Sequence, residues 1–595
     1  MDSEGIARSD VAWREGRTAM GRLLWIILLL GGPALRGETE TADFIFHGGK
    51  VVTVDRQFRI HEALAIRGER VLGTGSDRDV LRLRGGDTRV VDLAGKTVLP
   101  GLMDSHTHAP GASVIEFDHP IPHMESIGDV LAYIRARAGT LDDGQWIHVR
   151  QVFITRLREQ RYPTRKELDE AAPRHPVAFT TGPDASLNSL ALKVSGIGKD
   201  FAVSDGGPGH AEKDPRTGEP TGILRGCNRA IKIEDPRRRP TEDERRERLR
   251  ELIRDYNSVG ITSIADRSAS PGSMKLYEDL LERGELTARV FLSAHVGTIG
   301  SVEEVKERIR QVAEHRLFRK HPMLRIGGIK TFLDGGMLTG SAYMRKPWGK
   351  SEIYSIDDPE YRGVLFIPRE KLLPIVEAAF GHGLQFTAHS VGDGAVHTLL
   401  DVYEEIARKG SIRSLRPCIT HSNFMSREAV EAMVRLGVVC DIQPAWLYLD
   451  TRTLVRQFGT ERLRYFQPLR TIFELGAIVG GGSDHMQKIG SLRSVNPYNP
   501  FLAMWVTLTR RARWYDESLH PEEALRREQA VRMYTINNAY LLFQEGETGS
   551  LEAGKYADFI VIDRDILSSP VDEVRTTRVL ETWLGGKKVF ELKGK

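Results

Sequence analysis

The sequence predicts an α/β fold that combines a (β/α)8 TIM-type barrel, a small β-sandwich built from both chain ends, and a domain inserted after barrel strand 1. Three observations support this prediction. Short apolar runs alternate with helical patterns in the second half of the chain, the two ends share a strand-and-turn composition, and residues 115–240 interrupt the alternation.

The two chain ends are predicted to share one domain. Residues 48–52 read Gly-Gly-Lys-Val-Val and residues 585–589 read Gly-Gly-Lys-Lys-Val, both within stretches of short strands and turns. We therefore assign residues 42–100 and 544–595 to a composite β-sandwich, which requires the middle of the chain to return to its start.

Eight apolar runs are predicted as barrel strands, within residues 101–114 and 241–543. Most are followed by a helical pattern, and one helix starts with a capping box at Ser301 and Glu304. Eight such units indicate a closed barrel, and the alternative is an open doubly wound sheet. The first run ends at His106, and the other seven span residues 261–266, 289–294, 326–333, 384–388, 417–420, 438–442 and 478–481.

Residues 115–240 are too many for an ordinary connection between one barrel strand and the next. We expect them to fold as an inserted domain over the barrel mouth. A helix over residues 242–256, capped by Thr241 and closed by Gly260, then returns the chain to the second strand.

Residues 1–37 are predicted to be a secretory signal peptide. Arg22 precedes an apolar run at residues 23–30, and small residues follow from Gly31. The run is shorter than the roughly 20 residues of a membrane-spanning helix. We expect an exported protein, periplasmic or extracellular. An uncleaved membrane anchor, and a start at Met20 instead of Met1, are the open alternatives.

The charge balance narrows the classes of partner that we expect. The 595-residue chain has 84 basic and 81 acidic residues and a net charge of +3, which gives no reason to expect nucleic acid. We expect a small-molecule substrate, and a homodimer stays open. The arginines at 237–239 adjoin acidic residues, as in a solvated loop.

Three cysteines are too few for a disulfide framework, and buried free thiols are expected at Cys227, Cys418 and Cys440.

Candidate metal ligands follow several predicted strands. His106 and His108 lie two residues apart on an extended segment, so both imidazoles point to one side and can reach a cation such as zinc. Taken alone, this pair is equally typical of a metal site and of two unrelated histidines in a loop. Each further candidate alone is explained by packing, but the whole set lies at strand ends, where barrel enzymes build their active sites. These further candidates are Lys330, His389, His421 and Asp484.

Five segments carry a family resemblance: residues 101–108, 389–393 (His-Ser-Val-Gly-Asp), 480–484 (Gly-Gly-Gly-Ser-Asp), 534–539 and 549–558. Together they resemble the amidohydrolase superfamily. The most similar branch is amidohydrolase family 3, the YtcJ-like proteins that include N-substituted formamide deformylases. The resemblance covers nearly all of the mature chain.

The resemblance implies a role for each candidate ligand. His106 and His108 would bind the more buried metal, and His389 and His421 the second. Lys330 would be carboxylated and bridge two metals, because a free ammonium offers donors only. Asp484 would contact the bridging hydroxide and act as the general base. The implied cofactor is Zn²⁺, two per chain, or one if an uncarboxylated Lys330 pairs with Asp484.

Several positions depart from the family pattern and leave the substrate open. Ser422 follows the strand-six histidine where the family often has glutamine, and the segment after Gln443 lacks a histidine. The strand-five motif has no His-x-x-Glu, which argues against the nucleoside-deaminase branch of the superfamily. Some residues are expected behind the metals or against substrate, with packing as the alternative. They are Asp393, Asn423, Gln443, Tyr343 and Trp446.

The implied function is hydrolysis by an exported metal-dependent enzyme. A metal-activated hydroxide would attack an amide or cyclic amide and cleave a non-peptide C–N bond. Hydrolysis of an ester or lactone on the same site is one alternative. A catalytically silent ligand-binding barrel is another, and the intact Asp484 argues against it, because a binder needs no general base.

Overall fold

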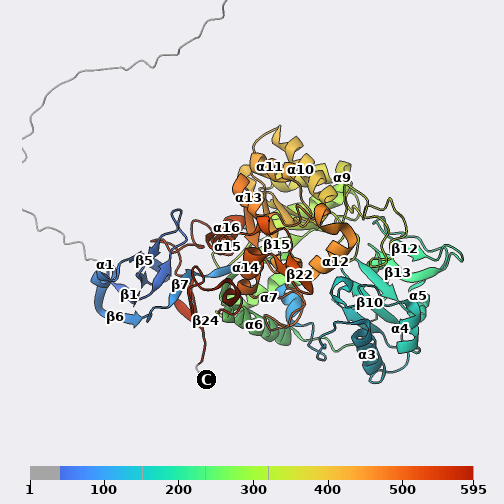
Figure 1. The fold of residues 1–595 in the computed structure, drawn as a ribbon, viewed down its shortest axis with the longest axis horizontal. Coiled ribbons are helices and arrows are strands. Elements are labelled where there is room, and N and C mark those ends of the chain that lie inside the picture. Colours follow the sequence, from blue (N-terminus) through green and yellow to red (C-terminus); the bar gives the residue numbers. More distant parts are fainter. Residues whose placement is uncertain (1–39, 151, 235, 319–320, 594–595) are drawn as a thin grey trace, which may run out of the picture. The chain divides into compact units, whose positions relative to one another are not determined.

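The centre of the fold is one sheet of eight parallel strands (Figure 1). The computed structural model describes residues 40–593 except 151, 235 and 319–320, so the predicted signal peptide lies outside the described residues. Each strand pairs with the next one along the chain. In order they are β8 (Leu102–Thr107), β14 (Ile261–Ala269), β15 (Arg289–His295), β16 (Leu324–Phe332), β17 (Gln385–Ser390), β18 (Cys418–His421), β19 (Val439–Ile442) and β20 (Ile478–Gly481).

The last strand returns to the first. Beyond β20, His485 forms a parallel bridge with Thr107, and the Asp484 amide donates a hydrogen bond to the His106 carbonyl at 2.8 Å. Gly101, just before β8, must be glycine because a Cβ there would lie 2.1 Å from Thr262 Oγ1. The predicted barrel fold is confirmed, including its eight strands.

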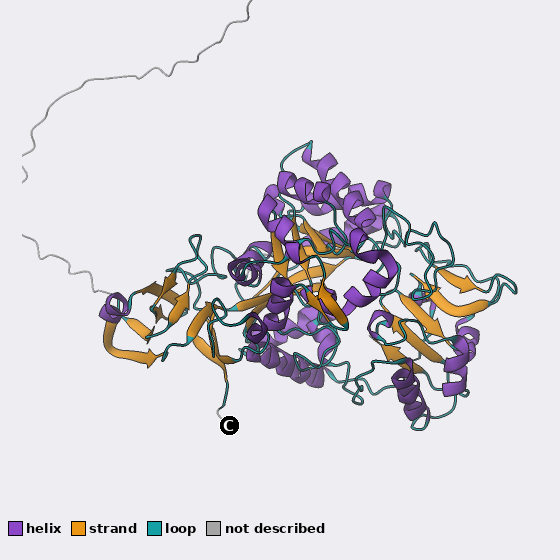
Figure 2. Cartoon of the chain, viewed as in Figure 1, coloured by secondary structure: helices purple, strands orange, loops and turns teal. Residues whose placement is uncertain are grey.

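Helices surround this sheet (Figure 2). The predicted helix starts at Thr241 and Ser301 both carry complete capping boxes, in which side chain and backbone satisfy each other's free donors. These two helices are α6 (Glu242–Ser258) and α8 (Val302–Ala313). The others along the barrel include α7 (Pro271–Glu282), α9 (Arg369–Gly381), α10 (Asp393–Ala407), α11 (Arg427–Leu436), α12 (Pro444–Arg462) and α13 (Leu469–Leu475).

Both chain ends contribute to a pair of sheets beside the barrel. Strand β7 (Thr97–Pro100), which leads into β8, pairs antiparallel with β23 (Phe559–Ile562) from the other end of the chain. Phe46, Phe559 and Trp583 pack ring against ring between the sheets, with centroids 5.2 to 5.4 Å apart. One sheet holds β1 (Ala42–His47), β4 (Ala63–Arg67), β5 (Arg70–Gly75) and β6 (Arg84–Asp92). The other adds β2 (Lys50–Val52), β3 (Ile60–His61), β24 (Val579–Leu584) and β25 (Lys587–Glu591).

The segment between β8 and β14 forms a five-stranded sheet with its own apolar cluster. Trp146, Leu187 and Leu224 belong to that cluster, which is separate from the main barrel core. The strands are β9 (Ile147–Arg150), β10 (Val177–Thr181), β11 (Asp184–Leu187), β12 (His210–Lys213) and β13 (Pro220–Arg225), and the helices are α3 (Ile127–Ala138), α4 (Arg165–Ala171) and α5 (Ser189–Ser195).

A buried arginine ties this inserted sheet to the barrel. The Arg156 guanidinium donates to both carboxylate oxygens of Asp450, at 3.2 and 2.9 Å, and to Asn496 Oδ1 at 2.7 Å. Asn496 in turn donates from Nδ2 to the main-chain oxygen of Asp484 at 2.6 Å. The insertion is therefore linked, through two side chains, to the backbone of a candidate site residue.

We expect Arg156→Met to lower the free energy of unfolding by about 3–5 kcal/mol, because it leaves the Asp450 carboxylate buried without its charge partner. Urea unfolding measures the loss, and limited proteolysis should cut within residues 115–240 faster. Arg158→Met is the matched control. The Arg158 side chain is 68% exposed, and its ion pair with Glu125, at 3.5 Å, lies at the surface. Equal stability of the two variants would contradict the docking role.

Two further observations concern the whole described chain. The cysteines Cys227, Cys418 and Cys440 are buried and free, as predicted. Among the described residues, no helix has both the length and the apolar content needed to cross a bilayer.

Candidate metal centre

The candidate ligands surround a single open cavity of about 1740 Å³. It lies at the carboxyl ends of the barrel strands, where backbone pairing ends and side chains are free to converge. All six residues predicted as ligands line it, and they lie in or just after the carboxyl-terminal parts of five strands, because His106 and His108 share the end of β8. They are His106, His108, Lys330, His389, His421 and Asp484.

Three donor atoms meet at one point of this cavity. His106 Nε2 lies 3.3 Å from His108 Nε2, and Asp484 Oδ1 lies 3.3 and 3.2 Å from these two nitrogens. Burial holds the pKa of His106 well below its usual value, so its ring is neutral and Nε2 can offer a lone pair. Two imidazoles and a carboxylate at this spacing match the donor set that zinc and similar cations take.

The backbone around this triad is held in an uncommon conformation. Asp484 and His421 both have positive φ values, 54° and 78°, which cost free energy for residues with a side chain. Gly482 cannot carry a Cβ, since one would lie 2.9 Å from both His106 Cβ and Ser105 Oγ. The glycine-rich approach to Asp484 therefore lets the end of β20 come close to the end of β8.

The remaining histidines adjoin the triad without joining its tight cluster. The His421 ring stacks on the His106 ring with centroids 4.9 Å apart, and the His389 ring lies 4.5 Å from that of His421. His389 Nε2 is 3.3 Å from the Gly335 carbonyl oxygen. Burial lowers the pKa of His389 to about 3, so this imidazole is neutral.

Lys330 is buried at the centre of the site. Burial lowers the pKa of its amine to about 8, although the carboxylates of Asp441 and Asp484 oppose the shift. Among the described residues, none forms a hydrogen bond or ion pair with Lys330 Nζ, which lies 5.3 Å from the centroid of the Phe332 ring. An amine with this pKa is more readily neutral at physiological pH than an ordinary lysine.

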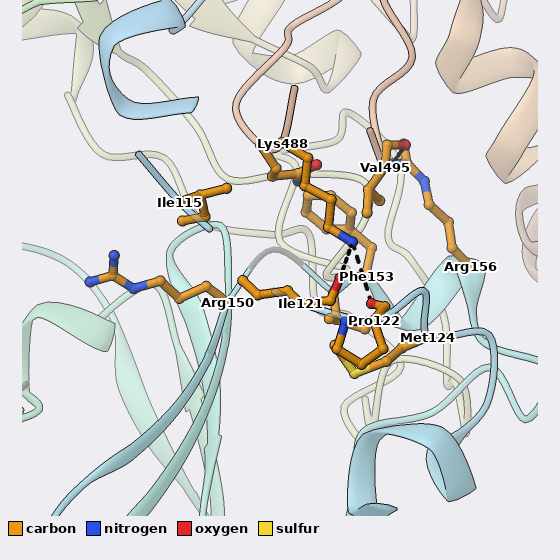
Figure 3. A pocket seen from close by; sticks show the side chains of 11 residues that line it. Ile115, Ile121, Pro122, Met124, Arg150, Phe153, Arg156, Lys488 and Val495 are labelled. Atoms are coloured by element: carbon orange, nitrogen blue, oxygen red, sulfur yellow. Dashed lines mark hydrogen bonds between the residues drawn. The ribbon is translucent and has the colours of Figure 1, made fainter. Parts of the chain in front are cut away.

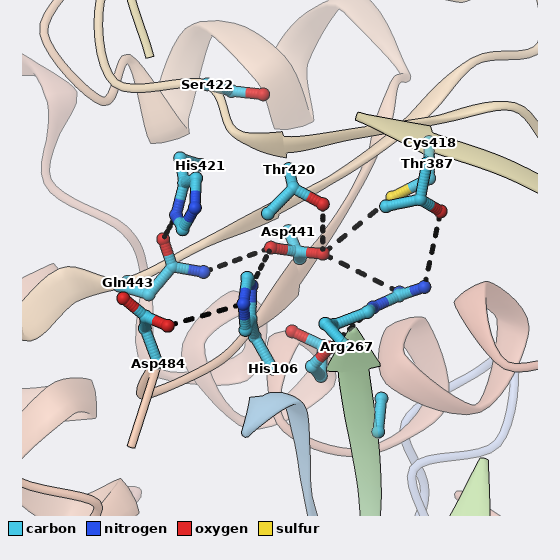
Figure 4. A network of polar contacts seen from close by, with 12 residues as sticks. His106, Arg267, Thr387, Cys418, Thr420, His421, Ser422, Asp441, Gln443 and Asp484 are labelled. Carbon is cyan, nitrogen blue, oxygen red and sulfur yellow. Dashed lines mark hydrogen bonds and ion pairs between the residues drawn. The ribbon is translucent and has the colours of Figure 1, made fainter. Parts of the chain in front are cut away.

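Sequence reasoning missed a set of charged residues inside the barrel. Asp441 on β19 and Arg267 on β14 are fully buried beneath the triad, and Asp334 is buried just after β16. A signal for Asp441 was present, because it is a charged residue inside the apolar run at residues 438–442. Figure 4 shows Asp441 between His106 and Arg267.

The chain matches a known protein family along most of its length. A model of the amidohydrolase family, amidohydrolase family 3, matches residues 89–590. The chain belongs to this family. It is similar to the N-substituted formamide deformylase of Arthrobacter pascens, at 28% identity over 93% of this chain and 100% of that protein. It is also similar to the Bacillus subtilis protein YtcJ, at 24% identity over 92% of this chain and 99% of YtcJ.

A solved structure shows the same fold. The crystal structure of an uncharacterized metal-dependent hydrolase from Pyrococcus horikoshii superposes with a TM-score of 0.63 at 22% identity, covering 89% of this chain and 99% of that one. The family membership predicted from the five segments is thus confirmed, and the chain is an amidohydrolase-family hydrolase.

The residues predicted to lie behind the metals or against substrate occupy different places in this amidohydrolase. Trp446 lines the cavity and stacks on His421, with centroids 4.8 Å apart. Gln443 does not line the cavity but contacts His421 from behind, with Oε1 2.8 Å from His421 Nδ1. Asn423 is fully buried, and no described residue hydrogen-bonds to its side-chain amide.

Asp393 and Tyr343 are not brought to the cavity. Asp393 is the first residue of α10, and its carboxylate accepts a hydrogen bond from the Arg345 amide at 2.9 Å. Asp334 is the carboxylate near His389, at 3.8 Å, and it accepts from the amides of Tyr343 and Gly392. Burial raises the pKa of Asp334 to about 8. In the strand-five motif the amides of Val391 and Gly392 therefore donate to Asp334, and the Asp393 carboxylate contacts the Arg345 amide instead.

The outer wall of the cavity is shared between the barrel and the insertion. The insertion contributes Arg150, Phe153, Thr180 and Asn228. Apolar side chains dominate the wall as a whole, which suits a substrate with a sizeable apolar part. They include Ile115, Phe332, Leu338, Phe366, Trp446 and Met486.

A smaller cavity of about 420 Å³ adjoins this wall (Figure 3). It shares Ile115, Arg150 and Phe153 with the larger one. At its edge the Lys488 ammonium donates to the carbonyl oxygens of Ile121 and Pro122, at 2.8 and 3.3 Å. The loop after β20, which carries Asp484, is thereby joined to the loop after β8, which carries His108.

Proposed function

We propose that this amidohydrolase is a metal-dependent enzyme that hydrolyses a non-peptide C–N bond in an amide or cyclic amide. One observation carries the proposal: His106 Nε2, His108 Nε2 and Asp484 Oδ1 converge within 3.3 Å of one another in a cavity. Two imidazoles with a carboxylate fit a divalent cation, and Zn²⁺ is the proposed one.

The other predicted ligands would extend the site toward a second cation. His389 and His421 would hold it, and Lys330, carboxylated by carbon dioxide, would add a negatively charged oxygen ligand. The amine pKa of about 8 supports this, because only a neutral amine reacts with carbon dioxide. When bound, the cations would supply Lewis acidity, which lowers the pKa of a water from ~16 towards ~7 and polarises the substrate carbonyl.

Asp484 is the proposed proton carrier. Burial raises the pKa of its carboxyl group, which makes the carboxylate a stronger base than one in water. It would accept the proton of the attacking water and deliver it to the leaving nitrogen, which must be protonated to depart as an amine. Its fixed backbone, held by His106 and Asn496, keeps the carboxylate facing the two histidines.

Two observations support the proposed substrate class, one from the cavity and one from a relative. The A. pascens relative is named an N-substituted formamide deformylase. The largely apolar wall supports an N-substituted amide with an apolar substituent, because such walls bury apolar area at about 25 cal/mol per Å². An ester or lactone hydrolase is the second candidate, since the same activated water would attack either carbonyl.

A substrate panel tests the reaction. The Zn²⁺-loaded full chain would be offered N-substituted formamides, other amides, cyclic amides, and the ester or lactone of matching shape. We expect kcat/KM for an amide to exceed that for its matched ester. The reverse order would favour the ester alternative, and tight binding with no turnover of any compound would support the silent barrel.

Removal of the metal should abolish turnover. We expect dialysis against a chelator to lower kcat to background, and stoichiometric Zn²⁺ to restore it, because the residues alone lack a Lewis acid. Elemental analysis of each sample, with circular dichroism to verify folding, accompanies the assay. A metal-free, folded sample with undiminished turnover would contradict metal dependence.

Export is a further part of the proposal. The apolar run at residues 23–30 and the small residues after it support a cleaved signal peptide. We expect the mature chain to begin between Gly31 and Thr41, and N-terminal sequencing of protein from its native host measures this. An intact N-terminus would favour the membrane anchor.

A further inference from the structure

Asp441 lies beneath the candidate metal centre, in the interior of the barrel. It is on β19 and fully buried. Its Oδ1 atom faces the site, 3.2 Å from His106 Nδ1 and 3.0 Å from Gln443 Nε2 (Figure 4). Its Oδ2 atom faces away, 3.3 Å from Thr420 Oγ1 and 3.6 Å from Arg267 Nη2. The two oxygens therefore serve different neighbours.

Arg267 supplies the opposite charge. It is fully buried on β14, and its guanidinium donates to the Ser105 carbonyl at 3.1 Å and to Ser293 Oγ at 2.9 Å. An arginine side chain has donors only and stays charged, so an acidic partner offsets part of the cost of burying one. Among described residues, Asp441 is the one acid in an ion pair with Arg267.

The hydrogen-bond pattern fixes the protonated nitrogen of two histidines. An ionised Asp441 only accepts, so His106 Nδ1 must carry the hydrogen, and Nε2 keeps its lone pair toward His108. Gln443 gives its amide hydrogens to Asp441, so its Oε1 turns to His421 Nδ1 at 2.8 Å. His421 must then donate from Nδ1, which leaves its Nε2 lone pair available as well.

We propose that Asp441, with Arg267 as its charge partner, is the positioning residue for both halves of the metal centre. It sets the Nε2 ligand atom of His106 directly and that of His421 through Gln443. The inference rests on the proposed metal dependence. One carboxylate would thus orient ligands of two different cations, as carboxylates that contact metal-bound histidines commonly do for one.

The first test measures the histidines without any metal. The chelator-treated full chain, labelled with ¹⁵N-histidine, reports by NMR which ring nitrogen carries hydrogen, and His106→Gln and His421→Gln assign the signals. We expect Nδ1–H for both histidines in the parent. In Asp441→Asn both should lose this preference, and in Gln443→Leu only His421 should. An unchanged His106 signal in Asp441→Asn would overturn the proposal even if the chain binds no metal.

The second test measures metal affinity. Competition titration with a zinc indicator should show both sites weakened by about 10–100-fold in Asp441→Asn, and only one site in Gln443→Leu. The absorption spectrum of the Co²⁺-loaded protein should change in the same pattern. Thr420→Val is the matched control, because it removes a hydrogen bond to the far oxygen of the same carboxylate.

Two outcomes distinguish a failure of the proposed metal dependence from a failure of the proposed positioning role. Parent protein without zinc affinity, but with Nδ1–H on both histidines, would reject the metal dependence and leave the positioning role standing. Equal weakening in Thr420→Val and Asp441→Asn would reject the positioning role, because any disturbance of the barrel interior would then suffice. Where Asp441→Asn fails to fold, the double variant with Arg267→Met removes the unpaired charge and carries the same expectations.

Discussion

Asp484→Asn is expected to lower kcat by on the order of 10³-fold or more while the chain folds normally and keeps most of its metal. General base catalysis is typically worth ~10²–10⁴-fold, and asparagine keeps the shape of the side chain but cannot take a proton. In the structure, Asp484 Oδ1 lies 3.3 Å from His106 Nε2 and 3.2 Å from His108 Nε2. The measurement is kcat on any substrate that the panel yields, with circular dichroism and elemental analysis on the same sample.

Asp393→Asn is the matched control for this variant. Its carboxylate lies at the start of α10 and accepts from the Arg345 amide, outside the cavity. We expect its kcat to stay within a few-fold of the parent value. Near-normal turnover in a folded Asp484→Asn chain would show that Asp484 is not the general base. A large loss of turnover in Asp393→Asn would instead indicate that the strand-five motif contributes to catalysis.

Lys330→Ala is expected to hold one cation instead of two and to lose roughly 10²–10³-fold in kcat. A Lewis acid contributes several kcal/mol to the transition state, and each ~1.4 kcal/mol corresponds to a tenfold change in rate. Elemental analysis after loading with zinc and bicarbonate gives the metal content. Added formate or acetate should restore part of both, because a small carboxylate fits the vacated space and offers two oxygens.

Lys330→Arg distinguishes the carboxylated lysine from an ordinary ion pair. Arginine keeps the positive charge, so a lysine that merely pairs with Asp484 would be replaced at small cost. A guanidinium cannot become a carbamate with free oxygens, so a bridging role predicts the same metal loss as in Lys330→Ala. Full metal content in both variants would reject the bridge.

Much of the fold was predictable because barrel strands are continuous apolar runs. A parallel strand covered on both faces needs apolar side chains at nearly every position, and such runs stand out between helical patterns. The strand ends at His389 and His421 were found this way, and β17 and β18 both end within one residue of them. The capping boxes at Thr241 and Ser301 are local signals, since both partners lie within one turn.

The convergence of the candidate ligands on one cavity was predictable for a related reason. The carboxyl ends of parallel strands meet at one face of a barrel, so polar residues there converge even when far apart along the chain. This argument needs only the position of each residue in its own strand. It does not extend to Asp393, which was expected behind the metals from the family motif. The first turn of α10 directs that side chain to the Arg345 amide, and Asp334 is the carboxylate near His389.

By itself, the sequence determined which segments become strands and helices, where the insertion lies, and which residues stand at the strand ends. These properties depend on neighbours within a few residues. Only the tertiary structure decided which buried charges meet. His106 and Asp441 are 335 positions apart, and Arg267 reaches Asp441 across the barrel interior. No local pattern encodes such a pair, because its geometry exists only once the eight strands have closed around it.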